Sequence, residues 1–282
     1  MTISVVIPTR DRPVELRRLL AALAAQTRPP DEVVVVDSGS TPIPERTAAL
    51  PINVLRTTPH VCVQRNAGIR ASSGELIFLI DDDVVPEPDF IAVMARTFDL
   101  HPEYAGGMGT LPPSMRRFSA GALLCRLFML QHEYGDGGYY LSGHPRHPYG
   151  IGTFRETRVL GGGLMAVRRA ALMSMPELFD ESMEHSQEDS EFSLRLSERH
   201  RLFFNPLARV AHTASPIGRP PALERARRTL AAYRYIYAKN IFPARPWTLP
   251  FHWWAVVGMF VVGTLTGPAG TARGYWRGLN TG

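Results

Sequence analysis

The chain has 282 residues, of which 45% are hydrophobic and 20% are charged, which is typical of a globular protein with a full hydrophobic core. Its formal net charge of +5 favours anionic partners, such as nucleotide phosphates or an anionic lipid surface. The sequence contains no recognisable nucleic-acid-binding module, so nucleic acid is not an expected partner. Its two cysteines form neither a disulfide framework nor a metal-binding spacing. Because Met1 leads directly into an apolar run, we expect no signal peptide and a cytosolic location.

The N-terminal part of the chain alternates strand patterns with helix patterns. Apolar runs at residues 3–8, 32–37 and 52–56 predict strands. A helix is predicted from Pro13, with leucines on its buried face and Asp11 available as its cap, and another over residues 64–70. This alternation predicts right-handed crossovers and a parallel sheet. A glycine-rich phosphate loop is missing after the first strand, which argues against a dinucleotide enzyme or a P-loop ATPase and leaves phosphate to be held by metal and side chains.

The most informative segment is a predicted strand over residues 76–80 that ends in Asp81, Asp82 and Asp83. A run of consecutive apolar residues suits a central strand covered on both faces, and open α/β sheets bind ligands at the carboxyl ends of such strands. Adjacent carboxylates repel one another, so a positive charge is expected beside them. Mn²⁺ or Mg²⁺ is the simplest candidate, because both ions suit carboxylate and phosphate oxygens. A solvated acidic turn is the alternative.

The middle of the chain is predicted to be less regular. After a helix over residues 89–100, we interpret the irregular segment 106–153 either as a functional loop or as a surface excursion. It contains His132, His144 and His147, whose spacing matches no zinc site. Beyond it, a strand pattern flanks three glycines at 161–163. Glycine there would let a ligand approach the backbone closely, or would mark a bulge without a ligand.

A second acidic cluster, Glu188 and Asp189, opens a helix predicted over residues 187–196. A carboxylate at a helix N-terminus is stabilised in its ionised form and can accept a proton, although an acid at this position can also serve only as a cap. A short strand is predicted over residues 202–205, and residues 210–213 follow it. By itself, His212 in that segment is interpreted as structural.

The C-terminal part has a different character. A basic, aromatic helix is predicted over residues 222–240, and an apolar segment over 247–265 follows it. This segment is short for a spanning helix and contains glycines, but tryptophans near its start and arginines beyond its end favour an interfacial helix at a membrane surface. A core helix or a dimer-contact helix is the alternative.

Taken together, these segments resemble glycosyltransferase family 2. The motifs that carry the resemblance lie at residues 5–10, 35–40, 65–68, 81–83, 161–163 and 188–189, and the match extends over about residues 1–215. The resemblance implies an α/β protein with the GT-A fold, in which helices flank a mostly parallel, Rossmann-like central sheet. It divides the chain into a glycosyltransferase domain, 1–215, and a C-terminal helical extension, 216–282. Within the domain, residues 1–105 would form the nucleotide-binding half and 106–215 the acceptor-binding half.

The family resemblance also implies an activity and a set of site residues. A sugar would move from a nucleotide-diphosphate donor to a hydroxyl acceptor, with inversion at the anomeric carbon and with Mn²⁺ or Mg²⁺ as cofactor. The metal ligands would be Asp81 and Asp83, which form the DxD motif of the family, together with His212. Asp189 would be the catalytic base, with Glu188 as the other candidate. The implied donor-binding residues are Pro8, Thr9, Arg10, Asp37, Arg65, Asn66, Asp81, Asp82 and Gly162.

Three functions remain open at this point. The first is an inverting, metal-dependent glycosyltransferase that acts on a polysaccharide, glycolipid or natural-product acceptor, including lipid-linked acceptors, as a peripheral protein at the inner face of the cell membrane. The second is a sugar nucleotidylyltransferase, which would need a glycine-rich basic loop where residues 9–13 stand. The third is a non-catalytic subunit that binds nucleotide sugars, for which the second acidic cluster would be superfluous.

Overall fold

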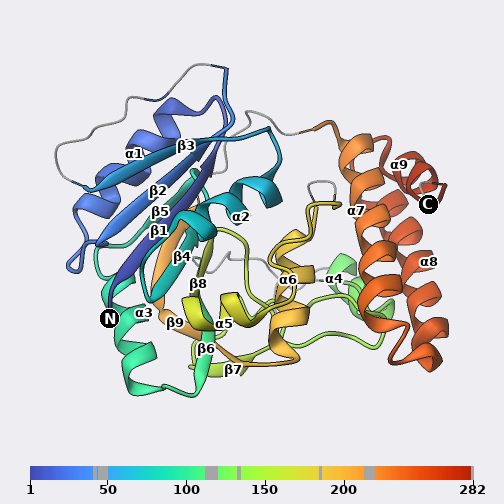
Figure 1. Ribbon diagram of the computed structural model, residues 1–282. Coiled ribbons are helices and arrows are strands. Elements are labelled where there is room, and N and C mark those ends of the chain that lie inside the picture. Colours follow the sequence, from blue (N-terminus) through green and yellow to red (C-terminus); the bar gives the residue numbers. More distant parts are fainter. Residues whose placement is uncertain are drawn as a thin grey trace.

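The computed structural model describes residues 1–40, 43, 50–111, 120–131, 135–183, 186–212 and 220–280. Its centre is one mixed nine-stranded sheet, shown in Figure 1. The strands follow one another across the sheet in the order β3 (Ile52–Arg56), β2 (Glu32–Asp37), β1 (Ile3–Thr9), β4 (Leu76–Ile80), β8 (Leu164–Arg168), β6 (Tyr104–Thr110), β9 (Arg201–His212) and β5 (Val84–Pro86), and β7 (Arg155–Thr157) pairs with β9.

The N-terminal half of the sheet is parallel, as predicted. β2 pairs with β3 and with β1, and β1 pairs with β4, all in parallel. The helices α1 (Pro13–Ala24), α2 (Val61–Ala71) and α3 (Phe90–Leu100) form at the predicted places. Asp11 is not the cap of α1, because Arg12 occupies that position and the Asp11 carboxylate accepts hydrogen bonds from Ser40 instead.

The second half of the sheet departs from the prediction. β8 runs antiparallel to both β4 and β6, so the sheet is parallel only in part. The segment predicted to be irregular contains most of β6 and the helix α4 (Ala120–Leu127), and the residues around 202–212 form one long strand, β9. β6 escaped prediction because glycines, which are poor strand formers, occupy it. They are needed there because the Phe203 ring lies where a Gly107 side chain would be, and the Ala208 carbonyl lies where a Gly109 side chain would be.

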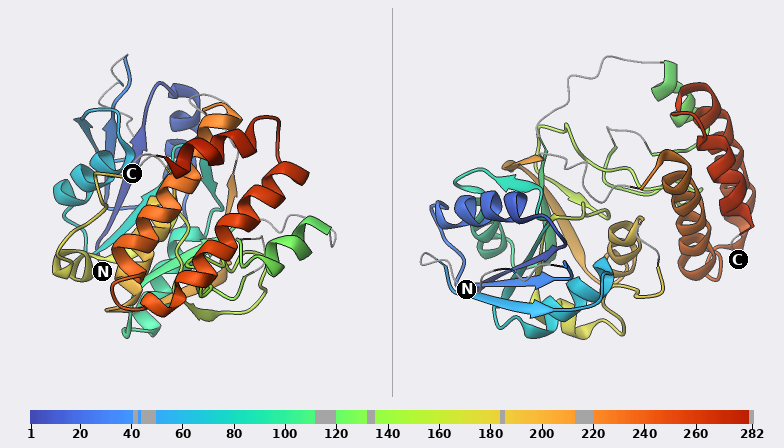
Figure 2. Two further views of the ribbon diagram at one scale, coloured as in Figure 1. Left: turned by 90° about the vertical axis from the view of Figure 1, so that its right-hand side faces the viewer. Right: turned by 90° about the horizontal axis from the view of Figure 1, so that it is seen from above.

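The C-terminal helices form a separate layer with its own small hydrophobic core. They are α7 (Ala222–Ile236), a π-helical turn (Tyr237–Ile241), a short 3-10 turn (Pro246–Thr248), α8 (Leu249–Thr266) and α9 (Thr271–Leu279). Figures 1 and 2 show α7, α8 and α9 side by side at the end of the molecule away from β3. The expected boundary between residues 215 and 216 lies outside the described residues.

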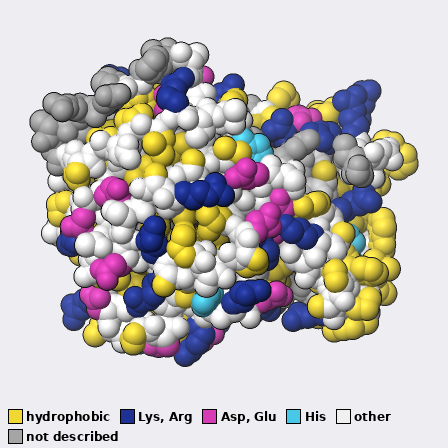
Figure 3. Space-filling view, viewed as in Figure 1, with side chains coloured by type: hydrophobic (Ala, Val, Ile, Leu, Met, Phe, Trp, Pro, Cys, Tyr) yellow, Lys and Arg dark blue, Asp and Glu magenta, His cyan; other side chains and the backbone are white. Residues whose placement is uncertain are grey.

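One face of α8 is apolar and exposed. Trp253, Trp254 and Val257 are 47%, 42% and 50% exposed, and Figure 3 shows hydrophobic side chains gathered along the edge of the molecule that α8 occupies. Among the described residues, one helix, Pro246–Thr266, has the length and composition of a membrane span, although 39% of it is buried inside the structure. Helices in soluble cores pass the same test, so this observation alone is weak grounds for a membrane span.

Candidate active site

The three acids after β4 do not play equivalent parts. Asp82 is buried, and its carboxylate accepts hydrogen bonds from the Thr9 hydroxyl at 2.7 Å and from Arg12 Nη1 at 2.9 Å. Burial raises the pKa of Asp82 despite these donors. Arg12 also lies 3.7 Å from the Asp83 carboxylate. Asp82 therefore ties the loop after β1 to the end of β4, and its predicted contact with a donor has no support in these contacts.

A buried arginine joins the two acidic clusters of the sequence. Arg65, on α2, is only 2% exposed. Its Nη2 lies 2.9 Å from Asp81 Oδ1, and its Nη1 lies 3.0 Å from Glu188 Oε1. Its guanidinium also lies 5.2 Å from the centre of the Phe179 ring. Arg65 and Arg12 thus provide part of the positive charge expected beside the acids after β4.

The glycines before β8 allow these clusters to meet. The Gly162 amide donates a hydrogen bond of 2.8 Å to Asp189 Oδ2. A side chain at Gly162 would press on Asp189 and on Arg65. Gly163 has a φ of +77° and lies against Asp81, so any side chain there would be strained and would collide with that carboxylate. The groups that approach the backbone of these glycines closely are therefore the carboxylates of Asp189 and Asp81.

Glu188 and Asp189 differ in ways that bear on their chemistry. Both stand in the first turn of α6 (Glu188–Ser197). The residue before the helix, Gln187, occupies the N-cap position with a left-handed backbone (φ of 61°). Glu188 is held by Arg65, and burial raises its pKa above the ordinary value, although Arg65 opposes this shift. Asp189 is half-buried, and no arginine is paired with it among the described residues. Because both acids stand at the helix N-terminus, it is the absence of an arginine partner among the described residues that makes Asp189 the better candidate for a base.

The predicted nucleotide-side residues follow β1 and β2, which are neighbours in the sheet. Pro8 and Thr9 end β1, while the side chain of Arg10 is 62% exposed. Asp37 ends β2 and is 1% exposed, and its carboxylate is engaged by the Gly39 amide at 2.7 Å and by Arg56. These contacts fix the Asp37 carboxylate at the end of β2, and its contact with a nucleotide stays a prediction.

Asn66 has a different environment from its neighbour in the sequence. Its amide nitrogen donates to the Phe179 carbonyl and to Glu181, both at 2.8 Å, and its oxygen accepts from the Phe179 amide at 2.9 Å. Both of its donors are therefore used to hold the segment around Phe179. Asn66 thus supports this segment, and its predicted contact with the donor stays a prediction.

The donor chemistry of the acids at the end of β4 suits a divalent cation, and their role as metal ligands stays a prediction. Asp81 and Asp83 offer carboxylate oxygens, the ligands that Mn²⁺ and Mg²⁺ prefer. The backbone of His212 pairs with Val84, so the chain brings that residue next to Asp83. The side chain of His212 lies outside the described part of the structure, so its role as a ligand stays a prediction. His132 also lies outside it, while His144 and His147 are buried, and burial lowers their pKa to about 3 and about 4.

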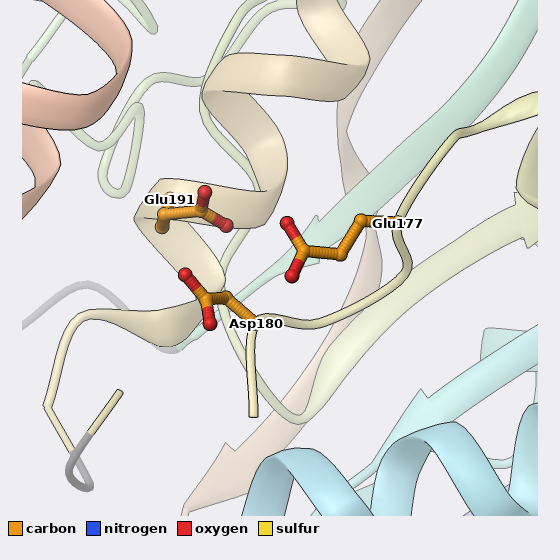
Figure 4. Close-up of side chains that lie close together, drawn as sticks. All are labelled: Glu177, Asp180 and Glu191. Atoms are coloured by element: carbon orange, nitrogen blue, oxygen red, sulfur yellow. The ribbon is translucent and has the colours of Figure 1, made fainter. Parts of the chain in front are cut away.

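A third group of acids has the geometry of a cation site. The carboxylates of Glu177, Asp180 and Glu191 point toward one another, as Figure 4 shows. The ammonium group of Lys239, from the π-helical turn, lies among them at 2.9, 2.5 and 3.3 Å respectively. Lys239 is the only lysine of the sequence. The Lys239 ammonium neutralises these carboxylates, as a bound metal ion would. Because Glu191 lies on α6, the same ion pairs connect the C-terminal layer to the helix that carries Asp189.

Removal of this ammonium group should destabilise the protein in a pH-dependent way. Burial acts to raise the pKa of Asp180, but hydrogen bonds from Lys239, Ser182 and Tyr235 outweigh it and hold the pKa below its usual range. We expect Lys239→Met to lower the free energy of unfolding at pH 7 by about 2 to 3 kcal/mol, somewhat less than for a fully buried pair, because it leaves carboxylates without a counter-charge.

The sign of the pH dependence follows from the lowered pKa of Asp180. The stabilisation is present above the unfolded pKa of about 4 and is lost as the pH falls toward the folded pKa. Urea unfolding should therefore show a smaller difference between Lys239→Met and the natural protein at pH 3 than at pH 7. Arg201→Met, at an exposed ion pair with Glu156, is the control and should change stability by less than about 1 kcal/mol. A Lys239→Met difference as small as the control's would contradict this role.

Sequence reasoning missed three charged residues of this region: Arg12, Arg56 and Lys239. A signal existed for Lys239, because a single lysine among 31 basic residues stands out. No local signal separates Arg12 from Arg10, because both follow β1 and only the turn into α1 decides which one faces the acids. Arg56 ends β3, and its meeting with Asp37 follows from the pairing of β2 with β3.

The sequence comparisons identify the family. Residues 4–171 match the model of the family described as Glycosyl transferase family 2. YwdF of Bacillus subtilis, described as an uncharacterized glycosyltransferase, is 37% identical over 105 residues, which cover 35% of this chain and 39% of YwdF. The chain thus matches only about two fifths of the length of that relative.

Solved structures with the same fold cover nearly the whole chain. TarS of S. aureus, over its residues 1–349, has a TM-score of 0.62 at 17% identity and covers 99% of this chain and 79% of its own. The mannosyltransferase PcManGT of Pyrobaculum calidifontis, solved with GDP-Man and Mn²⁺, has a TM-score of 0.58 at 18% identity and the same coverage. At such identities the likeness shows the fold alone, and it confirms the predicted GT-A fold. Because the family model matches more than half of its residues, the chain belongs to glycosyltransferase family 2.

Proposed function

We propose that this protein is an inverting glycosyltransferase that moves a sugar from a nucleotide-diphosphate donor to a hydroxyl acceptor. The observation that carries the proposal is the ion-pair bridge of Arg65, which brings Asp81 at the end of β4 together with Glu188 at the start of α6. Residues more than 100 positions apart thus share one site. A transferase needs such a pair of acidic positions, one toward the diphosphate and one toward the acceptor.

Each cluster then has its own task. A bound Mn²⁺ or Mg²⁺ would offset the charge of the departing nucleotide diphosphate, and Asp83 and Asp81, with His212, are the residues that would hold it. Asp189 would remove the proton of the acceptor hydroxyl as that oxygen attacks the anomeric carbon. Thr9 and Asp37 would bound the nucleotide pocket. PcManGT was solved with both GDP-Man and Mn²⁺, which supports a donor site that combines a nucleotide sugar with a metal.

A thermal-shift screen would test the donor class. Uridine, guanosine and thymidine diphosphates would be added to the full chain, each with and without Mn²⁺. A ligand present at about 100 times its Kd stabilises the native state by about 2.7 kcal/mol, so one base should raise the melting temperature clearly and only with the metal. The same rise for all bases without Mn²⁺, or none for any, would count against the proposal.

Asp83→Asn should uncouple the metal from donor binding. We expect the affinity for the nucleotide diphosphate in Mn²⁺ to fall by about 30-fold or more, since the loss of one partner of a charge interaction costs about 2 to 5 kcal/mol. The residual affinity should no longer depend on Mn²⁺. Isothermal titration calorimetry would measure both quantities. An unchanged affinity in Mn²⁺ would remove Asp83 from the metal site, and Asp99→Asn, on α3, is the matched control.

We further propose that the protein is peripheral at the inner face of the cell membrane, with the exposed face of α8 as its contact. The arginines of α7 and α9 would add attraction to anionic lipid headgroups. Val257→Glu should release the protein from anionic vesicles in a sedimentation assay, because the charge would lie in the apolar contact. Val14→Glu, which is equally exposed on α1, should leave binding unchanged. Equal sedimentation of both variants would show that α8 is not the contact.

A further inference from the structure

A cavity of about 390 Å³ lies between the C-terminal helices and the start of α6. Its walls are mainly apolar and come from four helices, with Cys125 on α4, Ala226 on α7, Met259 and Val262 on α8, and Tyr275 on α9. A volume of this size is typical of small-molecule sites. It adjoins the site described above, because Gln187, which also lines it, is two residues before Asp189.

Polar side chains interrupt these apolar walls, namely Gln131, His144, Gln187, Arg225 and three threonines (Thr229, Thr266 and Thr271). His144 is 5% exposed, its ring stacks on Tyr233 at 4.0 Å, and neither ring nitrogen has a hydrogen-bond partner among the described residues. Gln187 reaches from the start of α6 toward the Thr229 carbonyl at 3.5 Å. Arg225, in the first turn of α7, is exposed beside the cavity. Both ring nitrogens are enclosed by the protein, so His144 contributes the flat, non-hydrogen-bonding part of its ring to the cavity wall.

We propose that this cavity holds the apolar part of the acceptor, and that the acceptor is an amphiphile whose hydroxyl-bearing end reaches the start of α6. The inference rests on the proposed glycosyltransferase function and names the substrate class of the same site. The apolar walls fit an alkyl chain, while Gln187 and Arg225 fit the polar end of the same molecule. The wall formed by α8 carries the exposed apolar face on its other side, so the cavity lies one helix away from the proposed lipid contact.

Binding of two alkyl glycosides to the full chain tests the proposal. The probes are n-octyl β-D-glucopyranoside, used below its micelle-forming concentration, and methyl β-D-glucopyranoside, which has the same sugar without the chain. Calorimetry should show saturable binding of the octyl compound and much weaker binding of the methyl compound. Val262→Phe fills the cavity and should weaken octyl binding by about tenfold or more, the loss expected when about two methylenes lose their apolar contacts. Equal binding of both probes, or undiminished octyl binding in Val262→Phe, would overturn the proposal.

Matched variants separate this outcome from other causes. Val257→Phe makes the same change on the exposed face of α8, outside the cavity, and should leave octyl binding unchanged. If Val262→Phe fails to fold, Thr266→Phe, at an exposed position that also lines the cavity, replaces it. Nucleotide diphosphate binding in Mn²⁺ should be the same in all variants. If the octyl compound binds but no nucleotide diphosphate does, the proposed function is refuted and the cavity remains an amphiphile site. If a nucleotide diphosphate binds but the octyl compound does not, only the proposed role of the cavity is refuted.

Discussion

Asp189→Asn is expected to abolish turnover while leaving the donor bound. A positioned general base contributes about 10²- to 10⁴-fold to a rate, so kcat should fall by that factor. The asparagine oxygen can still accept the hydrogen bond of the Gly162 amide, and what is lost is the hydrogen bond from the adjacent Ser190 amide to the other oxygen. The local fold and the donor affinity should therefore persist. Release of nucleotide diphosphate from the donor selected by the thermal-shift screen, with water or an alkyl glycoside as acceptor, measures the rate. Calorimetry measures the affinity.

Glu188→Gln is the matched comparison for this prediction. Glu188 is already engaged by Arg65, whereas Asp189 has no arginine partner among the described residues, so the Glu188 carboxylate is the less available of the two as a base. Its substitution should lower kcat much less than Asp189→Asn does. The opposite ranking would assign the base to Glu188. Near-natural rates in both variants would remove the base from α6 altogether.

Arg65→Met is expected to cause the largest loss of stability of any single change at the site. Arg65 is buried, and its guanidinium neutralises Asp81 and Glu188 at once. Breaking a buried ion pair by removal of one partner costs about 3 to 5 kcal/mol, because the remaining charge is left uncompensated. Urea unfolding at pH 7 would measure the change. Arg70→Met, on the same helix but 63% exposed and 3.9 Å from Glu181, should change stability by less than about 1 kcal/mol.

A double variant isolates the charge interaction from the loss of packing. Glu188→Gln removes the most buried of the two carboxylates that Arg65 neutralises. Placed in the Arg65→Met background, it should restore at least about 1 kcal/mol, since residues in one ion-pair network couple by about 0.5 to 3 kcal/mol. If the losses of unfolding free energy in the two single variants simply add in the double variant, the loss in Arg65→Met comes from packing. The ion pairs of Arg65 would then contribute nothing measurable to stability.

The elements that could be predicted are those with a local signal. The buried runs of β1, β2 and β4 and the leucine spacing of α1 depend only on neighbouring residues, and they form where expected. β6 could not be predicted in the same way. Its glycines are explained by Phe203 and Ala208 of β9, almost 100 residues away, and only the folded sheet brings those partners together.

The same distinction holds for the candidate site. The strand-end acids and the acids that open α6 have local signatures, so Asp81, Asp83 and Asp189 could be proposed from the sequence. The partners of these acids could not be predicted from the sequence, because a buried ion pair such as that of Arg65 and Glu188 joins residues far apart in the chain. Asn66 shows the converse, since it shares a motif with Arg65 but supports the Phe179 segment instead.

The central claim is that a metal-bound nucleotide diphosphate lies between Asp83 and Asp189. The most direct test is an anomalous-scattering map from crystals of the full chain grown with Mn²⁺ and the diphosphate chosen by the thermal-shift screen. The claim predicts one Mn²⁺ peak at about 2 to 2.4 Å from an Asp83 oxygen, with the terminal phosphate on the side of Gly162 and Asp189. A peak among Glu177, Asp180 and Glu191 instead, or a diphosphate bound away from Asp83, would contradict it.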